Sequence, residues 1–375
     1  MPRSVVTALL RTSAGWPQQT LSTAVRCNGP LSRALHSSQF KAAVAHPITA
    51  HGPPPKAPLP TPEFSPQSEQ PEQQTDSKET RQEGESRPSI KKPKALKKRF
   101  WKNVDVQKKQ GGDYQVLLDA RPVRDPAKSI LSIPSSKPYL AHAIALEWDV
   151  MNTAQQALKN HMIPLTSLTA RAADISQEDS EGVATVRNQI VKTAMGYLET
   201  DTLLCWVPEQ TDSPADDVDA NGQKRETLRE AQVRVANDII AFLSTKVWPG
   251  IDIVPVLDGD SIFPASQSHA TKEVIEQWIR GLEAHDLAAL ERGVLASKSL
   301  LVAARLVTEW SENFRALQRS GQKKFGIEEA AEASSLEVRW QTDMWGEVED
   351  THDVDKEDLR RQLGSVILLV SGETR

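Results

Sequence analysis

The sequence predicts an α+β protein in which a small N-terminal antiparallel sheet with one helix is followed by an all-α domain. Apolar and polar residues alternate over Phe100–Gln107 and Tyr114–Leu118, which is typical of strands. From about residue 180 the apolar residues recur every three or four positions, which is the spacing of amphipathic helices. The residues before Arg99 show neither pattern, so we expect the folded part to begin there.

Residues 1–45 have the composition of a mitochondrial transit peptide. The first fifty residues contain five basic side chains and no Asp or Glu, with Ser, Thr and Ala between them. Basic, acid-free segments of this kind direct proteins to organelles, and the long apolar stretch of a secretory signal is missing. The run Arg33–Ser38 is similar to a processing site of the fungal mitochondrial kind. A merely disordered basic tail is the alternative.

The composition of residues 46–98 predicts that they form a disordered linker. They are rich in Pro, Gln, Glu, Ser and Lys and contain almost no aliphatic side chains, so they cannot bury enough surface to fold. The basic end of the linker, Lys91–Arg99, could contact a partner or could act only as a solvated tether.

Charge and cysteine content narrow the class of protein. Removal of the first fifty residues takes away five positive charges and changes the net charge from −5 to −10, which argues against a nucleic-acid partner. No later apolar run is long enough to span a bilayer, so we expect no membrane insertion. Loss of Cys27 with the presequence would leave Cys205 alone, which excludes an internal disulfide and a Cys-rich zinc site. We expect an acidic, soluble protein of the mitochondrial matrix.

Residues 99–180 should form the α+β domain. Two glycines separate the first two strands, and Ile130–Pro134 predicts a third short strand. The segment Met162–Thr169 should link this domain to the next one. A helix capped by Ser135 or Ser136 should cover one face of the sheet. Its apolar stripe consists of Leu140, Ile144 and Trp148.

Residues 181–375 should form the helical domain. The connections are too varied for an up-and-down bundle, and no repeat is visible. Helices are expected near residues 183–194, 228–242, 274–282, 287–294, 297–310 and 334–353, and from Asp355 onward.

The stretch Ser334–Asp353 combines two tryptophans with five carboxylates between Glu337 and Asp350. If it is helical, one stripe of side chains can enter a core while a second stripe lies at its edge. Such a helix could carry an acid–base site, bind a metal with His352 and Asp353, or bind another protein. A core helix with a solvated acidic shoulder is the structural alternative. The expected core stripe is Leu336, Trp340 and Met344, and the edge stripe is Glu337, Gln341 and Trp345.

The motifs of enzymes are incomplete. Gly321–Gly326 has the glycine spacing of a phosphate loop, but Ile327 and Glu328 replace the required Lys-Ser/Thr and no strand precedes it. The acids of 349–355 with His352 could bind a divalent ion, although acids before a helix are more often caps or solvated surface. We therefore expect no cofactor, no metal and no catalysis. Acids and tryptophans without catalytic groups fit a binding surface better.

Six short segments occur in a fixed order: Arg99–Val104, Leu118–Val123, Ala145–Asp149, Pro164–Thr166, Asp201–Thr202 and Trp345–Glu349. In this order they resemble the Atp-twelve family of mitochondrial chaperones, over about residues 99–370. Trp101 and Ala120 depart mildly from the residues that the family most often has, Tyr and Gly. The stretches Pro208–Lys224 and Glu312–Gly326 are similar to lineage-specific expansions.

The resemblance implies a small α+β domain followed by an orthogonal helical bundle, and no catalysis. It implies that the chain holds the unassembled α subunit of the catalytic (F-one) sector of ATP synthase. We expect it to do so as a monomer. The expected client-binding residues are Glu337, Gln341, Trp345, Glu347, Glu147, Trp148 and Asp149. For Trp148, packing in the core is the alternative.

Two further functions stay open at this point. One is a metal-dependent hydrolase that uses the acidic and histidine residues of 347–355. The other is a general matrix scaffold that is held by its Pro/Gln-rich linker.

Overall fold

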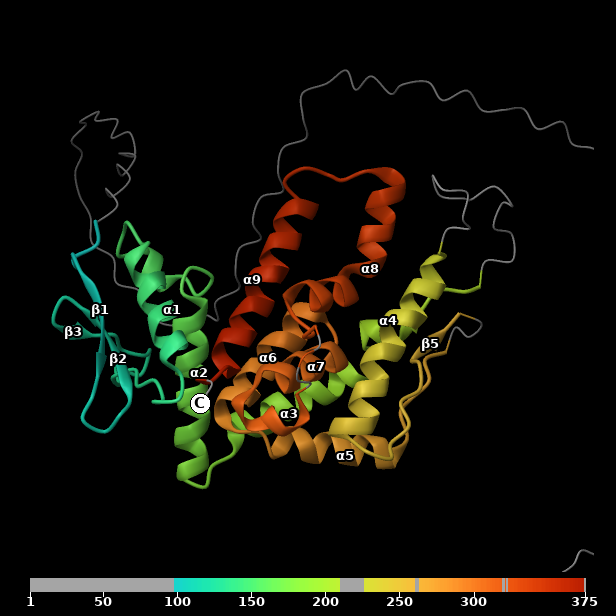
Figure 1. Ribbon diagram of the computed structural model, residues 1–375, viewed down its shortest axis with the longest axis horizontal. Helices are drawn as coiled ribbons and strands as arrows, with labels where there is room; N and C mark the ends of the chain where they lie inside the picture. The colour runs from blue at the N-terminus through green and yellow to red at the C-terminus, as the bar shows by residue number, and fades with distance from the viewer. Residues whose placement is uncertain (1–97, 210–225, 260–262, 319–320, 322, 374–375) are drawn as a thin grey trace, which may run out of the picture. The chain divides into compact units, whose positions relative to one another are not determined.

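The computed structural model describes residues 98–209, 226–259, 263–318, 321 and 323–373 (Figure 1). The predicted transit peptide (1–45) and the predicted linker (46–98), apart from Lys98, lie outside the described residues. The same holds for most of the stretch Pro208–Lys224.

A three-stranded antiparallel sheet opens the fold. β1 (Val104–Lys108) pairs with β2 (Tyr114–Leu118), and β2 pairs with β3 (Arg121–Pro122). Helix α1 (Pro138–Asp149) covers the sheet and packs on β1 and β2 with the buried side chain of Leu140 (Figure 1). The helices that follow complete an α+β fold, which confirms the predicted class.

The third strand lies elsewhere than the alternation predicts. The chain turns back directly after β2, because Asp119 adopts a left-handed conformation (φ 56°). The Asp119 carboxylate stabilises this turn by accepting the backbone N–H groups of Lys102 and Asn103 (3.1 and 3.0 Å). Arg121 and Pro122 therefore pair with the end of β2 as the third strand. The prediction of a strand at Ile130–Pro134 is wrong, because this segment forms only isolated β-bridges.

Helices α2 to α9 form the rest of the described fold. Short helical turns (η1–η4) and one parallel pair of two-residue strands connect them. No helix in the described part of the chain is long and apolar enough to cross a membrane. The helices are α2 (Pro164–Ser180), α3 (Thr185–Leu198), α4 (Leu228–Phe242), α5 (His269–Arg280), α6 (Ala284–Ser297), α7 (Leu300–Trp310), α8 (Ile327–Trp345) and α9 (His352–Val370). The shorter elements are η1 (Gln156–Leu158), η2 (Thr202–Leu204), β4 (Cys205–Trp206), η3 (Leu243–Val247), β5 (Leu257–Asp258) and η4 (Glu312–Leu317).

The predicted helices of the second half are confirmed as α3 to α7, but three boundaries differ. Pro164 does not belong to a linking segment, because it begins α2, which packs on α6. Helix α8 begins at Ile327 instead of Ser334, and α9 begins at His352 instead of Asp355. The buried face of α2 contains several Thr and Ala residues, so its hydrophobic pattern is weak in the sequence.

Helix α7 lies at the centre of the helical part. Every residue from Leu300 to Glu309 is buried, and the helix contacts α3, α4, α6, α8 and α9. Its two charged residues, Arg305 and Glu309, form an ion pair one turn apart. The Arg305 guanidinium also lies 3.7 Å from the centre of the Phe242 ring. Its charge is therefore paired with the Glu309 carboxylate, and its planar face contacts an aromatic ring.

The start of α7 is held by Asp201, whose side chain is fully buried. One carboxylate oxygen accepts the N–H groups of Leu300 and Leu301 (2.8 and 3.1 Å), and the other accepts the N–H of Leu203 in η2 (3.0 Å). The first N–H groups of a helix have no partner within the helix, so Asp201 supplies one from about a hundred residues away in the chain. Burial raises the pKa of Asp201 to about 6.

Lys137 joins the start of α1 to η4 and the end of α9. Its ammonium group is buried, lies 2.8 Å from the Glu312 carboxylate and donates to the carbonyl of Val370 (3.0 Å). The Ser136 hydroxyl donates to the same carboxylate (2.9 Å). The prediction that Ser135 or Ser136 caps α1 is therefore wrong, because Lys137 occupies the N-cap position and makes no side-chain cap bond.

The raised pKa of Asp201 predicts a pH-dependent stability. The folded-state pKa of about 6 lies above the ordinary value of 3.8, so the stabilising contribution is complete below pH 3.8 and is lost as the pH rises through 6. Relative to the non-titrating variant Asp201→Asn, the wild type should lose about 1 kcal/mol of unfolding free energy per pH unit between pH 4 and pH 6. Urea unfolding of both proteins at several pH values measures this difference.

The exposed Asp238 in α4 provides the control for removal of one carboxylate, as Asp238→Asn. A wild-type advantage over Asp201→Asn that stays constant from pH 4 to pH 7 would contradict the raised pKa.

Candidate functional site

Helices α8 and α9 extend beyond the helical core as a hairpin (Figure 1). We define the α8–α9 hairpin as residues 337–357, none of which is buried. Helix α8 bends at Ser335 (φ −125°, ψ 17°), and the buried residues of this helix all lie before Glu337. The hydroxyls of Ser334 and Ser335 donate to carbonyls four residues earlier (2.6 and 2.7 Å), a bond that bends helices. The bend therefore separates a packed half of α8 from an exposed half.

The exposed half carries large apolar side chains. Trp345 is 80% exposed at the end of α8, and Met344 beside it is also exposed. The expected core stripe is thus only partly correct, because Leu336 is buried, Trp340 is half-buried and Met344 faces solvent. Val338, Val348 and Val354 are the other exposed large apolar residues of the hairpin. A cluster of this kind is typical of an interaction surface.

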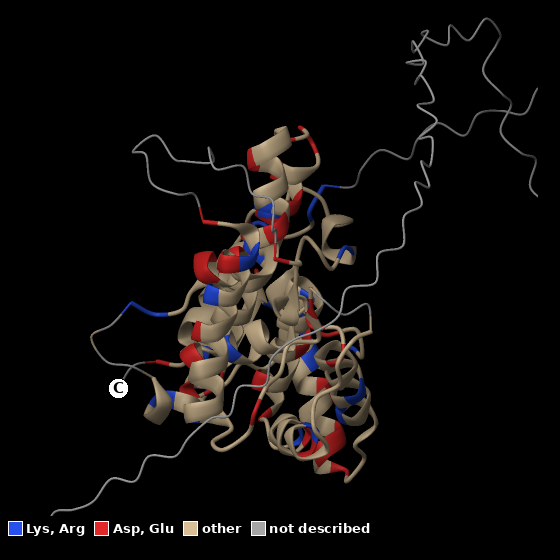
Figure 2. Cartoon of the chain, turned by 90° about the vertical axis from the view of Figure 1, so that its right-hand side faces the viewer, with Lys and Arg blue, Asp and Glu red and all other residues tan. Residues whose placement is uncertain are grey.

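The carboxylates of α8 divide at the same bend. Before it, Glu328 pairs with Arg360, Glu329 with Lys323, and Glu332 with Arg339. Beyond the bend, none of seven carboxylates forms an ion pair with a described residue. Figure 2 shows acidic residues at the end of the hairpin. These seven are Glu337, Asp343, Glu347, Glu349, Asp350, Asp353 and Asp355.

A small pocket lies at the bend, next to Glu337. It encloses about 210 Å³ between η2, α4 and residues 333–338 of α8. Leu203, Val235 and Leu336 give it apolar walls, while the exposed Glu337 stands at its edge. The Glu337 carboxylate accepts a hydrogen bond from the Gln341 amide (3.2 Å), so these two predicted site residues contact each other. An apolar hollow beside a carboxylate suits the aliphatic stem and charged end of a lysine or arginine.

The two remaining α8-side candidates stand apart from this pocket. Trp345 is the last residue of α8, and Glu347 lies in the loop that follows it. The structure therefore spreads the four predicted residues Glu337, Gln341, Trp345 and Glu347 along the exposed edge of one hairpin. His352, which could have been a metal ligand, accepts the N–H of Val348 through Nδ1 (3.0 Å).

The other group of predicted site residues ends α1 and makes contacts within the fold. Glu147 accepts the N–H groups of Leu165 and Thr166 at the start of α2 (2.6 and 3.0 Å). Burial raises the pKa of the Glu147 carboxyl, and these N–H groups oppose the shift. The Trp148 indole donates to the Thr166 hydroxyl (3.0 Å), while Asp149 is exposed. Glu147 and Trp148 therefore hold α1 against α2, and the exposed Asp149 carboxylate lies 3.4 Å from the Arg99 guanidinium.

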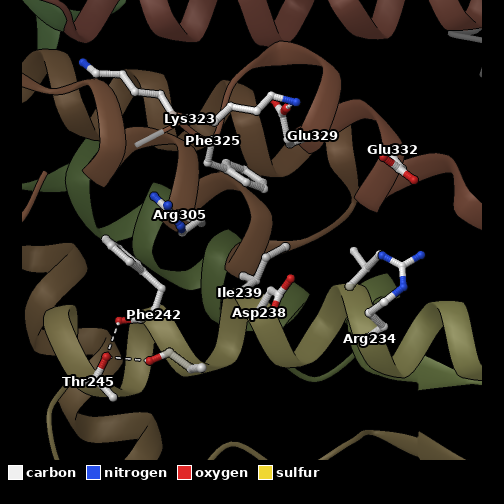
Figure 3. A pocket seen from close by; sticks show the side chains of 13 residues that line it. Arg234, Asp238, Ile239, Phe242, Thr245, Arg305, Lys323, Phe325, Glu329 and Glu332 are labelled. Carbon is white, nitrogen blue, oxygen red and sulfur yellow. Dashed lines mark hydrogen bonds and ion pairs between the residues drawn. The ribbon is translucent and has the colours of Figure 1, made fainter. Parts of the chain in front are cut away.

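A larger pocket, which the sequence analysis did not anticipate, lies between α4, α7 and the start of α8 (Figure 3). It has a volume of about 550 Å³, and Arg305 lies in it between the rings of Phe242 and Phe325. Its cations are engaged, since Arg305 pairs with Glu309, Lys323 with Glu329, and Lys324 lies over the Trp310 ring. The only indication in the sequence was one Arg and one Glu, four positions apart, inside an apolar run.

Metal coordination finds no support in the described residues, where no group of three or more His, Cys, Asp or Glu side chains could hold an ion. The acids of 347–355 lie along the loop and the first turn of α9 instead of around a common point. The chemistry of the α8–α9 hairpin is therefore that of a surface with carboxylates and exposed aromatic and aliphatic groups.

Comparison with known proteins adds the family. The family model of the ATP12 chaperone protein matches residues 98–244. The mitochondrial protein atp12 of Schizosaccharomyces pombe is 32% identical over 278 residues, which cover 74% of this chain and 83% of that one. The mitochondrial protein ATP12 of Saccharomyces cerevisiae is 28% identical over 280 residues, which cover 71% and 81%.

Solved structures share the fold. Atp12 from Paracoccus denitrificans aligns with a TM-score of 0.51 at 21% identity, over 73% of this chain and 97% of that one. A protein of Agrobacterium tumefaciens, described as a candidate chaperone, aligns with a TM-score of 0.52 at 20% identity, over 73% and 85%. The sequence identity to the relative from Schizosaccharomyces pombe, over most of both chains, establishes the relationship: this chain belongs to the ATP12 family of chaperone proteins.

Proposed function

We propose that this chaperone binds the unassembled α subunit of the catalytic sector of mitochondrial ATP synthase and releases it to the β subunit. An α subunit without its partner exposes the apolar surface that it will later bury against β, and such a surface aggregates unless it is covered. A chaperone that covers it moderately can be displaced by β, which buries more area. No catalytic step is needed for this function.

The α8–α9 hairpin carries the proposal. It presents Trp345 and three valines to solvent next to carboxylates that have no cation partner in the described chain. Aromatic residues contribute most of the binding energy in many interfaces, and unpaired charges select a partner of opposite sign. We propose Glu337, Gln341, Trp345 and Glu347 as the principal client-binding residues. Asp149, positioned by Glu147 and Trp148, is proposed as a second contact.

The cellular site follows from the relatives and the N-terminus together. Two relatives are named as mitochondrial proteins, and the first fifty residues of this chain are basic and free of acids. We propose that residues 1–45 direct import into the matrix and are then removed. The mature chain would act as a monomer, because its net charge of about −10 disfavours self-association.

The two other functions gain no particular support. A hydrolase would need convergent ligands, and the acids of 347–355 do not converge in the described structure. A scaffold that acts through its linker would leave the exposed hairpin without a role. A pull-down from matrix extract separates the three hypotheses, since only the client-binding hypothesis predicts enrichment of the α subunit.

Glu337→Lys should abolish most client binding without unfolding the chaperone. The exposed carboxylate would be replaced by an ammonium group of similar helix propensity, so the thermal midpoint should stay within about 2 °C of the wild type. Like-charge repulsion at the client should weaken binding at least about tenfold. Calorimetric unfolding and titration with purified α subunit measure the two effects.

Glu273→Lys, an equal charge change at an exposed position of α5, serves as the control and should bind the client normally. Normal client binding by folded Glu337→Lys would remove Glu337 from the interface. A large drop in melting temperature would show instead that Glu337 has an intramolecular role.

Trp345→Ser should weaken client binding by at least about thirtyfold, the effect of losing a central aromatic anchor. The side chain is 80% exposed, so its removal should leave the thermal midpoint within about 2 °C. Tyr139→Ser removes another exposed aromatic side chain, in α1, and should leave binding unchanged. Equal affinities of the two variants would mean that Trp345 does not contact the client.

A further inference from the structure

We infer that the basic segment Arg87–Lys97 of this chain docks on its own α8–α9 hairpin and covers it in the free chaperone. Displacement of this segment by a client rests on the proposed function, whereas the docking itself does not. Residues 87–97 lie outside the described structure, which begins at Lys98.

The hairpin offers an unpartnered apolar face. Met344, Trp345, Val348 and Val354 are more than half exposed and surround the loop between α8 and α9. A cluster of large exposed apolar side chains usually marks a contact. The occupant should contribute apolar side chains, and Ile90 and Leu96 of the basic segment can do so.

Charge selects the same occupant. Six carboxylates from Asp343 to Asp355 form no ion pair with a described residue. Between Arg87 and Lys97 the chain has five basic residues and no acid. The two stretches are therefore opposite in sign and nearly equal in number of charges. A second copy of this acidic chain would be repelled by the hairpin instead.

The segment is tethered within reach. Lys98 pairs with Thr153 in the loop between α1 and α2, and a later residue of that loop, His161, accepts a hydrogen bond from Arg361 of α9. Asp353 lies eight residues before Arg361 on the same helix, or ~12 Å along its axis. Eleven extended residues span at most ~36 Å. A tether this short gives an effective concentration on the order of 1 mM, so even a weak contact is populated.

Zero-length carbodiimide cross-linking of the full chain tests the contact directly. This reagent joins a lysine amine to a carboxylate that it touches, and mass spectrometry identifies the pair. Links should connect Lys91, Lys92, Lys94 or Lys97 to carboxylates of 343–355. They should form within one chain, as a mixture of ¹⁵N-labelled and unlabelled protein shows. They should fade between about 0.05 and 0.5 M salt, because salt screens such pairs.

Hydrogen exchange gives a second readout without any client. If the contact has a Kd of about 0.1 mM, the tethered segment would stabilise the hairpin about tenfold. Substitution of Lys91, Lys92, Lys94 and Lys97 together by Ser should therefore speed amide exchange in residues 343–355 about tenfold. The same fourfold Lys→Ser change at the exposed Lys102, Lys109, Lys159 and Lys192 is the control and should not alter it.

The inference is overturned if the lysines link mainly to the acids of 63–85, to another chain or to nothing, with hairpin exchange unchanged in the fourfold variant. Because no client is present in either experiment, this failure is distinct from a failure of the α-subunit proposal. Conversely, cross-links and slowed exchange would stand even if the client proves to be a different protein.

Discussion

The buried carboxylate of Asp201 is the interaction on which the helical part of this chaperone depends. It joins three N–H groups from two separate segments, η2 and the start of α7, at a place where water cannot replace it. Helix α7 in turn contacts α3, α4, α6, α8 and α9. The same η2 residues, Thr202 and Leu203, line the pocket beside Glu337. One side chain therefore fixes the central helix and supports the edge of the proposed binding surface.

The bend at Ser335 divides α8 into a half that packs in the fold and an exposed half that carries the proposed binding residues. Before Ser335 the helix has buried alanines and paired carboxylates, which are features of stability. After it, apolar side chains face solvent and seven carboxylates form no ion pair with a described residue, which raises the free energy of the isolated surface. A fold whose core is complete without the hairpin can tolerate such a surface. The proposed binding region can thus keep its exposed apolar side chains while the rest of the fold remains stable.

The sequence predicts local patterns of this protein better than its long-range contacts. The patterns over 114–118 and 300–310 predict β2 and α7, because both elements consist mainly of buried apolar residues that are adjacent in the sequence. The start of α2 is not predicted in this way, because its buried residues include Thr166 and Ala170, which give only a weak hydrophobic pattern. The bend at Ser335 and the capping of α2 by Glu147 depend on neighbours that periodicity does not reveal. For the site, the helical spacing correctly places Glu337 next to Gln341. The same spacing predicts Met344 in the core, but Met344 is exposed because α8 leaves the core after the bend.

The Lys137 contact has a consequence for the order in which the chain can fold. The ammonium group of Lys137 needs the carbonyl of Val370, and the backbone of Glu373 donates to Ser136 (2.7 Å). Both partners lie more than 230 residues after Ser136 and Lys137, so a polypeptide that emerges from a ribosome with its N-terminus first cannot complete these contacts until residues 370–373 have emerged. Until then the buried position of Lys137 would hold a charge without its acceptors, which is unfavourable. Packing of the start of α1 onto the end of α9 is therefore a late event in the folding of this chain.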